Sequence, residues 1–121
     1  MTQLLDIVNA TLTANNIPYE YEYWTSKVTY PYFVGEYRED DYSFEDGKSN
    51  GVFTIRGWSR SNTLELLLYR DIIEELFRDM QVIKDNKLCF IRYGGAFTVP
   101  TGEEGLYRLD VKLQVSEWKG E

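Results

Sequence analysis

The clearest pattern in the chain is a strict alternation of apolar and polar residues near its C-terminal end. The apolar positions are Tyr107, Leu109, Val111, Leu113 and Val115, and the polar positions between them are Arg108, Asp110, Lys112, Gln114 and Ser116. Successive side chains of a strand point to opposite faces of a sheet, so this alternation predicts an amphipathic strand with a polar outer face. Residues 87–93 and 96–100 predict an earlier strand that is bent at Gly94-Gly95, and residues 101–105 predict a turn after it.

The N-terminal half contains a second alternating segment and a hairpin. Residues 19–24 alternate aromatic and acidic side chains, which predicts a strand with one covered and one wet face. Residues 32–38 predict the next strand, with Pro31 at its entry, and residues 52–58 predict its antiparallel partner. The charged and turn-rich residues 39–50 lie between these strands and predict a long hairpin loop.

Two other segments repeat their apolar residues at helical spacing. Residues 3–15 predict a first helix, which ends at Asn15-Asn16 and Pro18 because Asn tolerates the left-handed conformation and Pro cannot continue a helix. A second, longer helix is predicted over residues 63–80, about 27 Å in length. Asn62 is its expected N-cap, with Glu65 three residues later as in a capping box.

The second helix carries more apolar surface than a small domain needs. Its apolar residues are Leu64, Leu66, Leu67, Leu68, Tyr69, Ile72, Ile73, Leu76, Phe77 and Met80. They cover more than half of the circumference, whereas a helix in a two-layer domain needs a stripe only about 100° wide. The excess indicates that the helix is either wrapped on two sides by its own chain or buried again against another subunit.

These elements predict a single α+β domain over residues 1–121. Short connections and hairpin turns favour a mostly antiparallel β-sheet with both α-helices packed on one face. The hydrophobic share of 43% is sufficient for one packed core. No apolar run reaches the roughly 20 residues of a membrane span, and Asp6 and Asn9 interrupt the N-terminal apolar residues, so we expect a soluble intracellular protein.

The composition offers little catalytic chemistry. The chain has no His, which removes the commonest general base and metal ligand, so Ser59 and Ser61 lack the usual triad partner. The single Cys89 lies in an apolar strand-like run and is expected to be a buried, inert thiol. Gly94-Gly95 is not followed by the residues of a phosphate loop. We therefore expect no enzyme, no catalytic residue, no cofactor and no metal site.

The acidic segment between the middle strands permits several interpretations. Its spacing does not match the ligand pattern of a calcium loop, and nothing nearby supplies a polarising partner for a catalytic carboxylate pair. A solvated loop and an acidic contact surface that orders on a partner both remain open. The candidate contact residues are Glu39, Asp40, Asp41, Glu45 and Asp46.

Charge and aromatic content point to surfaces rather than to a catalytic site. The net charge of -7 argues against direct binding to a nucleic-acid backbone. Seven of the ten tyrosines lie between Tyr19 and Tyr42, and Tyr suits interfaces because it combines large contact area with a polar tip. A preference of strands for aromatic residues would explain the same cluster. Six arginines are candidates for interfacial ion pairs: Arg56, Arg60, Arg70, Arg78, Arg92 and Arg108.

The middle of the chain resembles a family of virion proteins. Pro31-Tyr-Phe-Val-Gly-Glu36, a loop, Val52-Phe-Thr-Ile-Arg-Gly-Trp-Ser-Arg60 and a Leu/Ile-rich helix follow one another. This order is similar to the tail-completion or tail-terminator proteins of long-tailed bacteriophages and their prophages. The resemblance covers most of the chain in element order and about 15 residues in motif. The acidic hairpin and residues 19–23 depart from the family pattern.

The resemblance implies a ring, usually of six subunits, that caps the tail tube, stops its polymerisation and gives the head a docking surface. Expected partners are further copies of the chain, the major tail tube protein and head–tail connector proteins, in the host cytoplasm during assembly and then at the tail–neck junction of the virion. A ring requires two different, complementary patches on each subunit. The candidate interface residues are Tyr19, Tyr21, Tyr23, Tyr32, Tyr37, Trp58, Arg60, Leu66, Tyr69 and Ile73.

Two alternatives to a terminator remain open from the sequence. One is a head-closure or adaptor protein of the phage neck, which element order alone separates poorly from a terminator. The other is a small acidic cytoplasmic regulator that inhibits a DNA-binding protein by mimicking nucleic acid. For the terminator ring, the net charge of -7 and the location of the acidic loop also suggest the hypothesis that an acidic ring face or lumen repels DNA during its passage.

Overall fold

The computed structural model describes residues 2–22, 24, 27–43, 48–84 and 86–119 of the chain. The described residues form two helices and six strands, an α+β architecture as predicted. In chain order these are α1 (Thr2–Ala14), β1 (Tyr19–Tyr21), β2 (Tyr32–Ser43), β3 (Lys48–Ser59), α2 (Thr63–Phe77), β4 (Met80–Lys84), β5 (Lys87–Val99) and β6 (Tyr107–Lys119).

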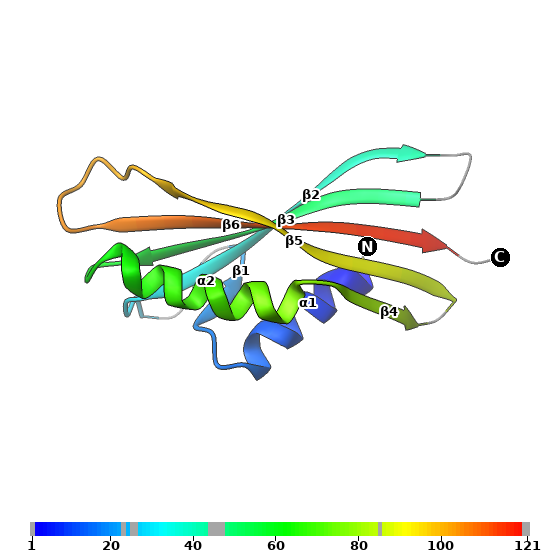
Figure 1. Ribbon diagram of the computed structural model, residues 1–121, viewed down its shortest axis with the longest axis horizontal. Coiled ribbons are helices and arrows are strands. Elements are labelled where there is room, and N and C mark those ends of the chain that lie inside the picture. The colour runs from blue at the N-terminus through cyan, green and yellow to red at the C-terminus, as the bar shows by residue number, and fades with distance from the viewer. Residues whose placement is uncertain (1, 23, 25–26, 44–47, 85, 120–121) are drawn as a thin grey trace.

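All six strands belong to one sheet, in the order β1-β2-β3-β6-β5-β4. Every neighbouring pair is antiparallel except β1 and β2, which run parallel. Figure 1 shows a strongly twisted sheet with α1 and α2 on the same side of it. The predicted sheet with both helices on one face is therefore confirmed.

The hydrophobic core lies between the helices and one face of the sheet. In β6 the alternating residues Leu109, Val111, Leu113 and Val115 are at most 2% exposed, which confirms the amphipathic strand. The same alternation runs through the whole of β3, where every second residue is buried. Core side chains from α1, α2 and the sheet form one cluster, so each helix is held by the same buried layer.

Several local signals in the sequence act as predicted. The side chain of Asn62 caps α2 by accepting a hydrogen bond of 2.9 Å from the backbone N–H of Glu65. The Glu65 carboxylate itself accepts a hydrogen bond of 2.6 Å from the Ser59 hydroxyl. Asn16 ends α1 with a φ of 59°, and Gly95 forms the bulge in β5 with a φ of 113°.

The strand boundaries require three corrections. The first strand ends at Tyr21 rather than at residue 24, since Glu22 adopts a φ of 69°. Residues 39–43 and 48–50, predicted as loop, belong to β2 and β3. Backbone pairing explains this extension, because β3 pairs with β6 over its full length, from Lys48 opposite Trp118 to Ser59 opposite Tyr107.

The end of the second helix is also corrected. The helix was predicted to reach residue 80, but α2 ends at Phe77 and Met80 begins β4. This strand was not predicted, and it pairs with β5 at the edge of the sheet. The apolar residues Met80, Val82 and Ile83 continued the apolar content of the helix, so no break in pattern marked the transition.

Candidate interaction surfaces

The outer side of α2 carries an exposed apolar stripe. Leu64, Leu68 and Ile72 are 62%, 58% and 43% exposed, and their spacing of four residues places them along one side of the helix. The opposite side is buried completely through Leu66 and Ile73. The described part of the subunit's own chain therefore leaves this excess of apolar surface uncovered.

This distribution corrects part of the predicted interface. Leu66 and Ile73 were expected to contact another subunit, but both are fully buried in the subunit's own core. Tyr69 is half-buried and packs edge-on against Phe33, with ring centroids 5.2 Å apart. Of the predicted helix positions, only Tyr69 therefore keeps part of its side chain at the surface.

Acidic side chains and a hollow accompany the apolar stripe. Asp71 and Glu75 project from the same side of α2, with side chains 59% and 75% exposed. A groove of about 450 Å³ lies beside Leu68 and Ile72 and is closed by the end of α1 at Asn16. We call Leu64, Leu68, Asp71, Ile72 and Glu75 together the outer face of α2. It combines an apolar centre with a charged border, in which Asp71 pairs with Arg70 and Glu75 pairs with Arg78.

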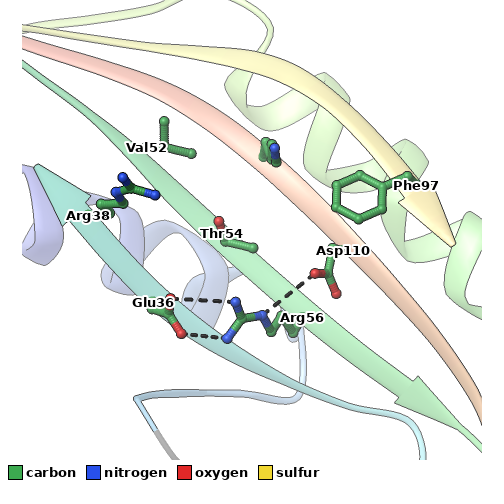
Figure 2. A pocket seen from close by; sticks show the side chains of 8 residues that line it. Glu36, Arg38, Val52, Thr54, Arg56, Phe97 and Asp110 are labelled. Atoms are coloured by element: carbon green, nitrogen blue, oxygen red, sulfur yellow. Dashed lines mark hydrogen bonds and ion pairs between the residues drawn. The ribbon is translucent and has the colours of Figure 1, made fainter. Parts of the chain in front are cut away.

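A chain of ion pairs crosses the other side of the sheet, which we call its open face (Figure 2). The carboxylate of Asp110 is only 6% exposed and accepts two hydrogen bonds from Arg108, of 2.9 and 3.0 Å. The Arg56 Nε atom lies 3.6 Å from Asp110, and the Arg56 guanidinium also pairs with Glu36. These four residues neutralise one another and fix the side chains in the centre of the face.

The open face nevertheless carries a positive charge. Four further basic side chains lie on it, in addition to the two arginines of the ion-pair chain, and line two shallow hollows of about 320 and 240 Å³. They are Arg38, Lys48, Arg92 and Lys112. Six basic and three acidic described side chains, the latter Glu20, Glu36 and Asp110, give this face a charge of +3, in a chain whose total is -7.

Aromatic rings lie between these basic groups at both ends of the face. Tyr32 and Trp58 stack with their centroids 5.1 Å apart, and the Arg108 guanidinium lies 5.6 Å from the Trp58 ring. At the other end the Lys48 ammonium lies 4.7 Å from the ring of Trp118. Two of the predicted interface residues, Tyr32 and Trp58, are thus brought together here.

Arg60, another predicted interface residue, lies beside this aromatic group. Its guanidinium is 5.4 Å from the Tyr30 ring and pairs with Glu103 at 3.3 Å. The contact with Tyr30, followed by that with Glu103, raises the pKa of Arg60. Arg60 therefore joins the start of α2 to the turn before β6.

The remaining tyrosines of the predicted interface lie on the core side of the sheet. Tyr19 donates a hydrogen bond of 2.6 Å to Asn9 of α1, and burial raises the pKa of its hydroxyl. Tyr21 stacks on Phe53 at 6.0 Å, and Tyr37 packs against the core cluster. The tyrosine cluster thus divides between the core side and the open face. Tyr23 lies outside the described residues.

The acidic contact segment is only partly described. Glu39 is exposed, and the backbone of Asp40 and Asp41 belongs to β2 instead of a loop. Glu45 and Asp46 lie outside the described residues. The paired strands β2 and β3 extend past the helices at one end of the sheet (Figure 1).

Cys89 is buried, as expected. Its thiol is 3.8 Å from the Glu117 carboxylate, and burial, followed by the neighbouring Glu117 charge, raises its pKa. The protonated thiol is a weak nucleophile. Within the described ranges, no group of three or more His, Cys, Asp or Glu side chains could hold a metal ion. None of the helices in this part of the chain is long and apolar enough to cross a membrane.

Comparisons with known proteins do not assign a family. The chain matches no protein-family model and no curated protein sequence.

Proposed function

We propose that this protein is a virion assembly protein of the tail-terminator type. It forms a ring on the end of the tail tube, stops tube polymerisation and presents a surface to which the head docks. The motif resemblance around residues 31–36 and 52–60 supports this proposal, together with an α+β fold in which a helix precedes the strand that begins at Tyr32 and a second helix follows the strand that ends at Ser59, as the resemblance implies.

The observation that carries the proposal is the exposed apolar stripe on α2. Leu64, Leu68 and Ile72 form one line on a helix whose opposite side already completes the core. Full burial of a leucine or isoleucine side chain stabilises a structure by about 1.5–3 kcal/mol. Covering these three side chains would therefore add stabilisation that the isolated subunit lacks. An apolar stripe with a polar border is typical of a surface that another protein covers.

Growth of tail tubes from purified tube protein of the same phage tests the function directly. We expect the wild-type protein to shorten the tubes in electron micrographs as its ratio to tube protein rises. Leu68→Asp should abolish this effect, whereas Glu104→Lys, in the exposed turn between β5 and β6, should retain it. Tube lengths that never respond to the wild-type protein would contradict a terminator and favour a neck adaptor.

A further inference from the structure

We propose that the outer face of α2 in one copy packs on the open face of the sheet in the next copy. This inference rests on the proposed ring and names the two surfaces that build it. Its occupant is a second copy of this chain. The argument follows from the layering of the fold, the charges of the two surfaces and their positions on opposite sides of the subunit.

The layering leaves one sheet face without a helix from the described part of the chain. Figure 1 shows α1 and α2 on the same side of the sheet, with the strands bare on the other side. An antiparallel sheet can leave one face solvated, and such a face can also accept a further layer, because helices pack on the faces of sheets. A helix from a neighbouring copy would give the sheet a third layer and cover Leu64 and Leu68 at the same time.

The charges of the two surfaces are opposite. The outer face of α2 carries two carboxylates, Asp71 and Glu75, on a helix whose net charge is -3; Asp71 pairs with Arg70 and Glu75 with Arg78. The open face carries +3 among its described side chains. Opposite potentials steer association and fix its register, and they disfavour pairing of either surface with itself.

The apolar parts of the two surfaces also match. Phe97 is 46% exposed on the open face, where it lies beside Lys112, whose ammonium is 5.3 Å from its ring. Leu68 and Ile72 of a second copy would meet this ring in the hollow of about 320 Å³, with Asp71 next to Lys112. An aromatic and aliphatic centre with a charged border is the usual composition of a specific interface.

The placement of the two surfaces on opposite sides makes the contact head-to-tail. Each copy uses its helix toward one neighbour and its sheet toward the other, so the contact is heterologous. Such contacts close into a ring when the rotation from copy to copy divides a full turn, and they form a filament otherwise.

A face with basic and aromatic side chains is also the chemistry that single-stranded nucleic acids recognise. Two observations favour the protein partner. Asp110 and Glu36 place carboxylates in the centre of the face, where a phosphate backbone would pass. The total charge of -7 would oppose a nucleic acid at longer range.

Complementation between two variants tests the contact. A helix variant, Asp71→Lys with Glu75→Lys, reverses the charge of the two carboxylates on the outer face. A sheet variant, Arg92→Glu with Lys112→Glu, reverses exposed charges on the open face. Each should be monomeric by light scattering where the wild type, alone or with tail tube protein, forms an oligomer. Circular dichroism checks that both fold, and Glu104→Lys serves as the matched charge control.

The mixture gives the decisive result. When the helix variant and the sheet variant are mixed, the reversed helix of one meets the reversed sheet of the other, so the mixture should form the oligomer that neither variant forms alone. Combining all four substitutions in one chain should likewise restore the wild-type oligomer. Leu68→Asp mixed with the sheet variant should give one-to-one heterodimers and nothing larger, because only one working surface of each kind remains. A ring that persists in both single-surface variants would overturn this contact and leave the terminator function intact.

Two other outcomes would also overturn the proposal. One is a wild-type protein that stays monomeric at high concentration even with tail tube protein. The other is a monomer that binds fluorescein-labelled oligothymidylate at 50 mM salt and loses this binding in the sheet variant. The second outcome would assign the open face to single-stranded nucleic acid instead.

Discussion

Replacing Asp110 by Asn should destabilise the subunit by about 2 kcal/mol. The carboxylate is 6% exposed, accepts hydrogen bonds of 2.9 and 3.0 Å from Arg108, and lies 3.6 Å from Arg56. Asn keeps the size but turns one acceptor into a donor facing a guanidinium. Hydrogen bonds to charged groups are worth about 1.5–3 kcal/mol each. The two arginines are 26% and 34% exposed and can recover part of this loss in water.

Urea unfolding at pH 7 measures this loss of free energy, with an unchanged m-value expected because the core is untouched. The matched control is Glu36→Gln, at the exposed end of the same ion-pair chain, where the carboxylate is 55% exposed. Its effect should stay within about 0.5 kcal/mol, as for other surface pairs. If Asp110→Asn is no more destabilising than Glu36→Gln, the reasoning about the buried ion-pair chain is wrong.

Three further predictions concern the core. Gly57→Ala should lower the free energy of unfolding in urea by about 1–3 kcal/mol, because a Cβ there would lie 2.2 Å from the Phe33 ring. A variant as stable as the wild type would contradict this packing. Leu66→Ala should lose about 2–5 kcal/mol, whereas Leu68→Ala, on the same helix but 58% exposed, should lose less than about 1 kcal/mol in the monomer. Reversal of this order would contradict the assignment of the two helix faces. Iodoacetamide at pH 8.5 should label Cys89 slowly in the folded protein and quickly in urea, because burial raises the pKa of the folded thiol. The contribution of Cys89 to the free energy of unfolding is therefore complete below the unfolded pKa of about 8.5, and it declines as the pH rises through the folded pKa.

Local sequence signals predicted most of the fold because they depend on short-range physics. The alternation in β6, the cap at Asn62 and the bulge at Gly95 are each decided within a few residues. Some of the errors fall where pairing with another strand decides the outcome. The charged residues around Glu39 read as loop, yet ladder hydrogen bonds to β3 hold them in a strand. The parallel pairing of β1 is likewise invisible to local patterns.

The candidate surfaces were only partly predictable for the same reason. The excess of apolar residues on the second helix was visible in the sequence, but which residues face outward depends on how α2 sits on the sheet. The open face depends on the register of β3 with β6, which places Arg56 opposite Asp110 and Trp58 opposite Arg108. A single sequence does not reveal that register. The only signal in the sequence was the alternation of polar residues in β3 and in β6, which indicates which side chains share a face.

Tail length in virions that lack this protein tests the proposed terminator function most directly. Electron microscopy of particles from a phage without the gene should show overlong tails of variable length, and supply of the wild-type protein should restore a uniform length. The Leu68→Asp variant, which leaves the core intact, should fail to restore it. Tails of normal and uniform length beside heads that leak DNA would contradict a terminator and assign the protein to the neck.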